Sequence, residues 1–260
     1  EPRTQISAGK RQSVTLSSSL TLALKQLAQR EEATLFIVLL TAFNTLLYRY
    51  TQQEDILIGT PIANRKWLET EALIGFFVNT LVLRTDLSGD PTFRELLDRV
   101  RSETFTAYEH QDLPFEMLVE ELQLDRQSNR PPLVQVMFAL QNASTSIGTL
   151  ANSTPIEIET ETTKFDLVLS VQESAESLTV SWSYNTAVFD CDTIERMSQH
   201  YELLLKHIVS NPNQSIATLP LLTESEKQQL LVEWNQTQTE YPRDACIQQV
   251  FEAQVEHSPT

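Results

Sequence analysis

Apolar residues recur with helical spacing in several stretches of the chain, and each of these stretches predicts an α-helix. The expected helices begin after Ser17, run from Leu35 to about Tyr50, from Phe93 to about His110, and from Ile194 to Ile208. Their start signals are the N-cap residues Ser17 and Thr34 and two capping boxes, Thr92 with Glu95 and Asp192 with Glu195. The stretch 35–50 is apolar on most sides, so we expect it to be buried between a sheet and another layer.

Alternation of apolar and polar residues with a period of two predicts strands at 12–16, 55–62 and 133–140. The clearest signal is a hairpin formed by 164–173 and 178–185. Its apolar face carries Phe165, Leu167, Leu169, Val171, Leu178, Val180, Trp182 and Tyr184. Its polar face carries Asp166, Ser170, Ser181, Ser183 and Asn185. This polar face is either solvated or the lining of a water-filled passage.

The stretch 74–84, IGFFVNTLVLR, is apolar on both faces of an extended chain, which is typical of a strand inside a sheet. Asn79 is its one amide in the middle of the run. A buried amide without partners costs about 1–3 kcal/mol, so Asn79 needs hydrogen bonds. Two interpretations follow: Asn79 is a satisfied structural amide, or it lies on the wall of a substrate channel and faces that channel from a central strand.

Composition and charge exclude several classes of protein. The net charge of −16 is opposite in sign to what nucleic acids and anionic membranes attract. Cys191 and Cys246 form no CxxC or Cys/His cluster, so neither a metal site nor a disulfide framework is expected, and a cytoplasmic, reducing location is. The apolar run 35–47 is interrupted by polar residues and is too short for a membrane span. Because the chain begins with Glu1, we expect it to be a piece of a longer polypeptide.

Few residues outside the strands suggest chemistry. Arg65 follows the strand 55–62, at the kind of strand end where sites gather in α/β proteins, although a lone arginine there is more often a surface charge. His110 and Asp112 lie where one helix closes and another opens, with Asp112 or Leu113 as the expected cap and Pro114 in the first turn. Residues two apart at a helix end point in different directions, so we expect His110 and Asp112 to be structural and not an acid/base pair.

Three motifs together resemble those of the condensation domains of nonribosomal peptide synthetases, which are chloramphenicol-acetyltransferase-like acyltransferases. Residues 74–84 fit the pattern IGxFVNTxxxR, with Gly75 and Arg84 at fixed positions. Residues 110–116, HQDLPFE, fit HQDxPFE through His110, Gln111, Asp112 and Pro114. Residues 126–133, RQSNRPPL, fit RDxSRNPL in part: Arg126 and Arg130 agree, whereas Gln127, Asn129 and Pro131 differ.

The resemblance implies an α/β (α+β) fold, namely a chloramphenicol-acetyltransferase-like lobe with a mixed sheet flanked by helices. It maps onto the C-terminal lobe of a two-lobed domain at residues 1–215, a linker at 216–244, and the start of an adenylation domain at 245–260. The family's catalytic HHxxxDG motif belongs to the other lobe. None of the four histidines here has that setting, so no residue of this chain inherits the catalytic role.

The function implied by the resemblance is peptide-bond formation between aminoacyl or peptidyl thioesters. Partner carrier proteins hold these substrates on 4′-phosphopantetheine, and the chain itself binds no cofactor. The other expected partners are the N-terminal lobe and the downstream adenylation domain. This chain would supply one channel wall, for which the candidate residues are Arg65, Asn79, Asp166, Ser181 and Ser183.

Two alternatives stay open beside ordinary condensation. The chain could be an epimerisation or cyclisation relative on the same fold, although the intact HQDLPFE and IGFFVNT motifs favour condensation. It could also be a noncatalytic docking or scaffold lobe. An intact upstream HHxxxDG motif would support the enzyme, and its absence would support the scaffold.

Overall fold

The computed structural model describes residues 7–65, 67–123, 131–142, 161–174, 176–239 and 245–258. The chain divides into two compact units, Glu1–Leu221 and Leu222–Thr260. The motifs and the sheet belong to the first unit, which is described first.

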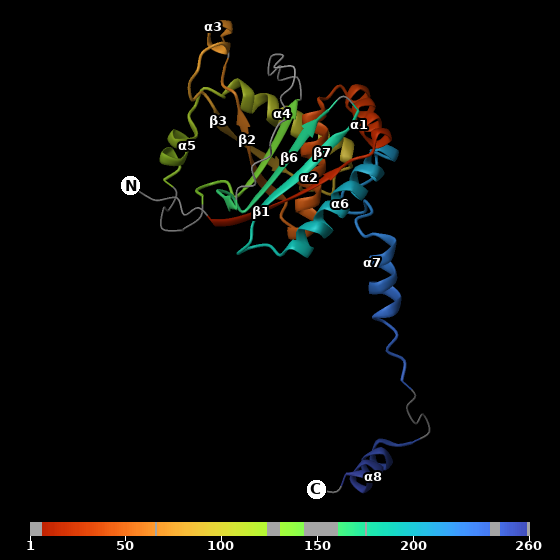
Figure 1. Ribbon diagram of the computed structural model, residues 1–260. Coiled ribbons are helices and arrows are strands. Elements are labelled where there is room, and N and C mark those ends of the chain that lie inside the picture. The colour runs from red at the N-terminus through yellow and green to blue at the C-terminus, as the bar shows by residue number, and fades with distance from the viewer. Residues whose placement is uncertain are drawn as a thin grey trace, which may run out of the picture. The chain divides into compact units, whose positions relative to one another are not determined.

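A seven-stranded mixed sheet forms the centre of the first unit (Figure 1). Its spatial order is β3-β2-β4-β6-β7-β1-β5. The strands are β1 (Ser7–Thr15), β2 (Asp55–Ile62), β3 (Asn79–Asp86), β4 (Val136–Asn142), β5 (Thr162–Thr163), β6 (Leu167–Glu173) and β7 (Leu178–Asn185). Strands β2, β4 and β6 run parallel to one another, and the remaining neighbours pair antiparallel. The expected mixed sheet with flanking helices is confirmed.

Four helices pack on one face of this sheet: α1 (Ser18–Arg30), α2 (Leu35–Thr51), α4 (Phe93–Glu109) and α6 (Cys191–Ser210). Helix α2 is buried along most of its length, as its apolar circumference predicts. On β7, Trp182 packs edge-on against Phe43 of α2 and Tyr201 of α6, with ring centroids 6.0 and 5.9 Å apart. The Tyr201 hydroxyl donates to the Leu39 carbonyl oxygen at 2.9 Å, and complete burial raises the pKa of Tyr201.

The opposite face of the sheet is contributed by the alternate residues of the same strands. The register pairs Ser13 with Ser181 and Ser181 with Ser170, so hydroxyl side chains from β1, β7 and β6 lie in one row. None of the four helices packs on this side in the described ranges, because their apolar partners are Val180, Trp182 and the other core-facing residues. We call this side the helix-free face.

The second unit contains short helical segments whose apolar side chains are exposed. Helix α7 (Glu224–Gln228) starts with a capping box formed by Thr223 and Glu226, and continues into a π-helical turn, Gln229–Glu233. Helix α8 (Ile247–His257) exposes Ile247, Val250, Phe251 and Val255. These residues form one apolar stripe that the unit itself does not cover.

The structure differs most clearly from the sequence-based expectation at residues 74–84, which were expected to form one strand inside the sheet. Only β3, from Asn79, is a strand, whereas Ile74, Phe76 and Val78 are exposed. Pairing with β2 ends at Ile62 and Asn79, so residues before Asn79 have no strand beside them. Strand β3 is also an edge strand and not a central one. An apolar pattern indicates burial against some surface but does not say which surface.

Two helix caps also differ from expectation. Helix α6 starts one residue after Asp190, so Asp192 lies in its first turn and does not form a capping box with Glu195. Helix α5 (Phe115–Glu121) has Pro114 as its N-cap, with no side-chain cap from Asp112. In both cases the helix boundary, which tertiary packing sets, lies one or two residues from the best local signal.

The apolar run 35–47, which was expected to be too short for a membrane span, lies within helix α2. In the part of the chain that the structure describes, no single helix is both long and apolar enough to cross a membrane. Helices α1 and α2 reach that length and composition only as a pair, and they are bent by 104° where they meet.

Candidate functional site

The helix-free face carries a belt of hydroxyl side chains on its three polar strands. The hydroxyl belt consists of Ser13, Thr15, Ser170, Thr179, Ser181 and Ser183. Ser13 and Ser181 share a hydrogen bond of 2.8 Å between their Oγ atoms, and the Arg11 guanidinium donates to Ser181 Oγ at 3.0 Å. Thr15 and Thr179 share another of 3.3 Å between their Oγ1 atoms. Hydroxyls can donate and accept, so the belt can hydrogen-bond the amide groups of a ligand.

Ser181 and Ser183 therefore lie together, and Asp166 lies near the same end of the hairpin. Asp166 precedes β6, and its carboxylate accepts a hydrogen bond of 3.2 Å from the Asn185 side-chain amide. Ser181 is only 2% exposed, because Arg11 and Ser13 cover it, whereas Ser183 is half-buried. The sequence pattern predicted a polar face here, and the register shows which strands share it.

Asn79 lies on the other side of the sheet, at the start of β3. Its amide nitrogen donates to the carbonyl oxygens of Gln111 and Leu113 at 3.1 and 2.9 Å. Its side-chain oxygen accepts from the backbone N–H groups of Thr80 and Phe115 at 2.9 and 3.1 Å. Four hydrogen bonds satisfy this amide, so Asn79 holds the corner between α4 and α5. This geometry is that of the structural interpretation, and a contact between Asn79 and a substrate stays a prediction.

The HQDLPFE motif forms that corner through its backbone. His110 is the C-cap of α4 and is exposed, and the Gln111 side chain donates to the Tyr108 carbonyl oxygen at 2.8 Å. The groups that bind Asn79 are backbone groups, two carbonyls and one N–H, and not the His110 or Asp112 side chains. The Asn79 side chain thus joins the two motifs, 74–84 and 110–116, by direct hydrogen bonds.

Arg65 supports the exposed segment that leads to β3. Its guanidinium donates to the carbonyl oxygen of Thr70 in the short helix α3 (Leu68–Glu71) and stacks 4.1 Å from the ring centroid of Phe77. Gly75 follows in this segment and has the Phe77 ring beside it, so an added Cβ would lie 3.0 Å from that ring. Arg65 therefore stabilises the apolar segment that contains Thr70 and Phe77. It follows β2 and is not part of the hydroxyl belt that contains Ser181 and Ser183.

Among the motif arginines, Arg84 joins the two strands at the edge of the sheet. Arg84 lies on β3 and forms a bidentate ion pair with Asp55 of β2, with Nη2 and Oδ2 2.8 Å apart. The hydrogen bond from Arg84 lowers the pKa of Asp55. Arg126 and Arg130 lie outside the described residues.

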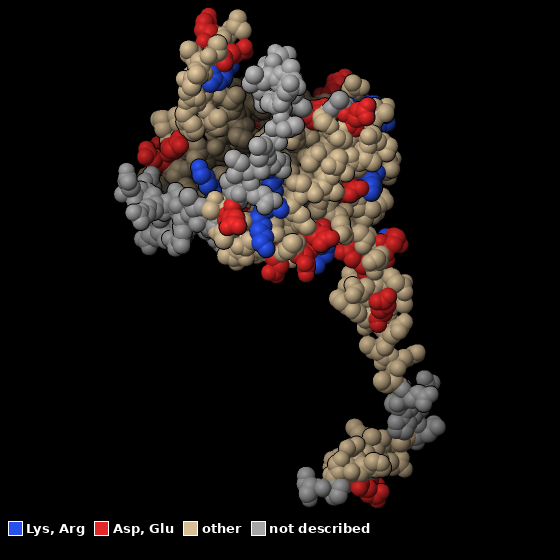
Figure 2. Space-filling view, in the orientation of Figure 1, with Lys and Arg blue, Asp and Glu red and all other residues tan. Residues whose placement is uncertain are grey.

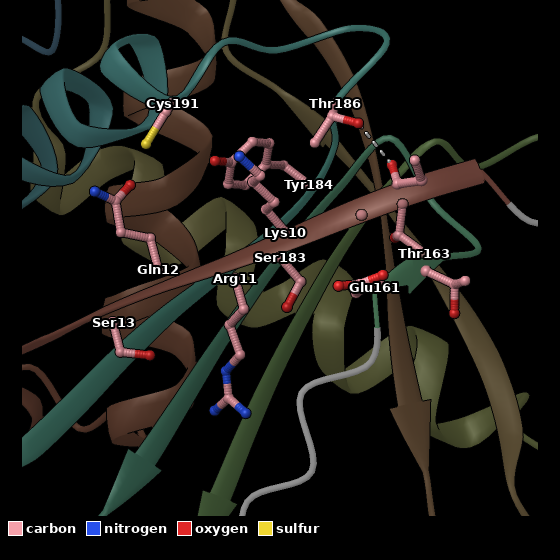
Figure 3. A pocket seen from close by; sticks show the side chains of 13 residues that line it. Lys10, Arg11, Gln12, Ser13, Glu161, Thr163, Ser183, Tyr184, Thr186 and Cys191 are labelled. Carbon is pink, nitrogen blue, oxygen red and sulfur yellow. Dashed lines mark hydrogen bonds between the residues drawn. The ribbon is translucent and has the colours of Figure 1, made fainter.

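A polar hollow of about 840 Å³ lies at the end of the sheet formed by β1, β5 and β7 (Figure 3). Lys10 and Tyr184 lie on one side of β1 and Arg11 on the other. Burial, and then a hydrogen bond with the Cys191 thiol, raise the pKa of Tyr184. Sequence reasoning missed this hollow. Its only local signal was two adjacent cations, Lys10 and Arg11, in an acidic chain.

No metal centre is indicated among the described residues, because no three His, Cys, Asp or Glu side chains converge. His200 is buried, and its Nδ1 lies 2.8 Å from the Tyr50 hydroxyl. His207 and His257 lie near the C-terminal ends of α6 and α8.

Comparisons with known proteins identify the family. The condensation-domain family matches residues 1–231. One component of the linear gramicidin synthase of Brevibacillus parabrevis is 53% identical over 254 residues, covering 96% of this chain and 5% of that protein. Surfactin synthase subunit 1 of Bacillus subtilis is 38% identical over 260 residues, covering 99% of this chain and 7% of that protein. The chain therefore spans a small part of the length of the curated relatives it matches.

Solved structures share the fold. A four-domain nonribosomal peptide synthetase bound to AMP and glycine superposes with a TM-score of 0.78 at 24% identity, over 84% of this chain and 18% of that chain. The X-domain from teicoplanin biosynthesis, solved in complex with OxyB, gives a TM-score of 0.75 at 26% identity, over 83% of this chain and 49% of that chain. With the sheet, the Asn79 corner and the motif segments in place, the match over residues 1–231 shows that the chain belongs to the condensation-domain family, with the chloramphenicol-acetyltransferase-like fold.

Proposed function

We propose that this chain is the C-terminal lobe of a condensation domain in a nonribosomal peptide synthetase, and that it forms one wall of the channel in which a peptide bond is made. The observation that carries the proposal is the helix-free face: Ser13, Ser181 and Ser170 lie in one row, with the helices α1, α2, α4 and α6 on the other side of the sheet. Coverage supports it too, since 83% of this chain superposes on 49% of the X-domain chain of known structure.

The substrates in this proposal are an aminoacyl and a peptidyl or aminoacyl thioester, each held on the 4′-phosphopantetheine arm of a carrier protein. The amine of one attacks the thioester carbonyl of the other, an amide bond forms, and the thiol of the donor carrier leaves. Holding both reactants in place can supply about 7–11 kcal/mol of such a barrier. The exposed hydroxyls of the belt, Ser13 and Thr15, and the half-buried Ser183 would contribute by hydrogen-bonding the amide groups of the tethered chains, whereas the buried Ser181 holds Ser13 and Arg11 in place.

This chain supplies no proton-transfer residue in the proposal. The described histidines are at helix ends or buried against Tyr50, and none lies on the helix-free face. The exposed apolar loop with Trp67, Leu68, Ile74 and Phe76 fits a surface that packs against the other lobe, which would carry the catalytic histidine. The chain alone is therefore expected to be inactive.

The wider assignment follows from the same proposal. Residues 1–215 form the lobe, 216–244 the linker, and 245–260 the start of an adenylation domain, which would bury the exposed stripe of α8. Both cysteines are free and exposed, which suits a reducing cytoplasm.

The test mixes the purified chain with donor and acceptor carrier proteins that are loaded with aminoacyl-phosphopantetheine, and follows dipeptidyl thioester by mass spectrometry. The full-length polypeptide that contains the chain runs beside it. We expect product from the full-length protein and none from the chain alone. Product from the chain alone at a comparable rate would contradict the division of roles between the lobes.

A second function is favoured by one comparison. The X-domain that shares this fold is solved in complex with another protein, OxyB. A docking lobe would use its surface to bind a partner without forming a bond. Absence of product from the full-length protein, with loaded carrier proteins still bound, would select this second function.

A further inference from the structure

A groove lies at the carboxyl ends of the three parallel strands, at the opposite end of the sheet from the hollow beside Lys10. Two adjoining hollows of about 260 and 380 Å³ form it, and both are lined by Phe36, Tyr108 and Leu140. The first reaches Pro61 at the end of β2 and Gln141 at the end of β4, and the second reaches Glu173 at the end of β6. Carboxyl ends of parallel strands are the usual ligand-binding edge of an α/β sheet. We call this feature the strand-end groove.

Aromatic side chains form the walls of the strand-end groove. Phe36 of α2 rests on Phe138 of β4, with ring centroids 5.2 Å apart, so its ring has a fixed position. Phe105 and Tyr108 of α4 also line the groove and are 57% and 37% exposed. Burial raises the pKa of Tyr108, which therefore presents a neutral ring. Large rings that remain exposed beside a hollow are typical of a binding surface and not of a finished core.

The lack of unpaired charge among the described residues of the groove indicates which kind of ligand it can bind. Among the described lining residues the only charged one is Glu173, and its carboxylate is neutralised by the Lys25 amine at 2.6 Å. Figure 2 shows the surface below α3 as a hollow among uncharged side chains. A charged ligand group would lose its hydration here without gaining a partner, whereas an apolar group would gain contact area.

The groove opens toward the proposed channel wall. Pro61 and Gln141 belong to the helix-free face, because they share its side of the register with Thr80 and Gln172. Phe36 and Tyr108 belong to the helices on the other side. A chain lying along the helix-free face can therefore place one side chain over the strand ends and into the groove.

We propose that the strand-end groove binds the apolar side chain of the tethered aminoacyl substrate, and that Phe36, Phe105 and Tyr108 determine this specificity. The inference rests on the proposed function, because the occupant is a substrate of that reaction. It adds the substrate class, an aliphatic or aromatic amino acid in preference to an acidic one.

The test measures binding without turnover. N-acetyl methylamides of L-phenylalanine, L-leucine and L-glutamate are titrated into the 260-residue chain, and amide chemical shifts locate the site by NMR. We expect the phenylalanine and leucine probes to shift residues around Phe36, Tyr108 and Leu140, and the glutamate probe to bind at least about tenfold more weakly. Equal binding of the glutamate probe, or shifts confined to other regions, would overturn the proposal.

Phe105→Ala sharpens the test, and Leu22→Ala is its matched control, because both residues are 57% exposed on helices. Phe105→Ala should weaken the phenylalanine probe about tenfold, while Leu22→Ala leaves it unchanged. If Phe105→Ala does not fold, Tyr108→Ala gives the same comparison. Substitutions that change neither binding here nor the ratio of products in an active full-length protein would refute the groove alone. If the probes bind in the groove but the full-length protein forms no peptide bond, the proposed function alone would be refuted.

Discussion

The two faces of the sheet are built from the same strands and differ in every second residue. On β7, Trp182 faces the helices and is fully buried, whereas its neighbour Ser181 faces the other way and takes part in the hydroxyl belt. The covered side gains stability by removing apolar area from water, about 25 cal/mol for each Å². On the helix-free side Ser181 is buried, but Ser13 and Thr15 are exposed and Ser183 is half-buried, so these hydroxyls are available for binding. One strand can therefore serve stability and function at once.

The largest expected effect is on the covered side. Trp182→Ala removes a ring that contacts Phe43 and Tyr201, and it should lower the free energy of unfolding by about 3–5 kcal/mol. Ser181→Ala, one residue away, removes a hydroxyl that bonds Ser13 and Arg11, and it should cost about 0.5–1.5 kcal/mol. Urea unfolding followed by circular dichroism measures both. Equal losses would break the comparison between the faces.

Asn79 is a polar residue on the covered side, which is otherwise mostly apolar, and its contribution to stability can be tested by substitution. Asn79→Ala leaves the Phe115 N–H and the carbonyls of Gln111 and Leu113 without this partner, so we expect a loss of about 1–3 kcal/mol. Asn79→Asp keeps the acceptor but removes the donor, and should be destabilised as well. Unchanged unfolding of both variants, with lost activity in the full-length protein, would favour the substrate contact.

The smallest effect is expected from the exposed pair on the helix-free side, Arg84 with Asp55. The hydrogen bond from Arg84 lowers the pKa of Asp55, so the carboxylate stabilises the folded state above its unfolded pKa of about 3.9. This contribution is lost as the pH falls through the lower folded pKa. The difference in melting temperature between the wild type and Arg84→Gln should therefore shrink below about pH 4, and also in high salt. A difference that grows on acidification would contradict this assignment.

The sequence alone predicted much of the local structure. The helix from Leu35, the strand 55–62, the capping box at Thr92 and the strand 178–185 agree with the structure within one residue. These elements carry their own signals, namely side-chain period and capping residues. The family was also readable, because its two complete motifs have fixed residues at fixed spacing.

What the sequence determined is the alternation that separates a covered from a helix-free side, since that depends only on neighbours along the strand. Tertiary structure decided the rest. Exposure of residues 74–78 and the edge position of β3 follow from where β2 stops pairing. The bonds from Asn79 to the α4–α5 corner join residues 32 and 34 positions apart. The strand-end groove needs α2, α4 and three strands to meet. Such features depend on which distant segments come together, and a local pattern of apolar and polar residues does not contain that information.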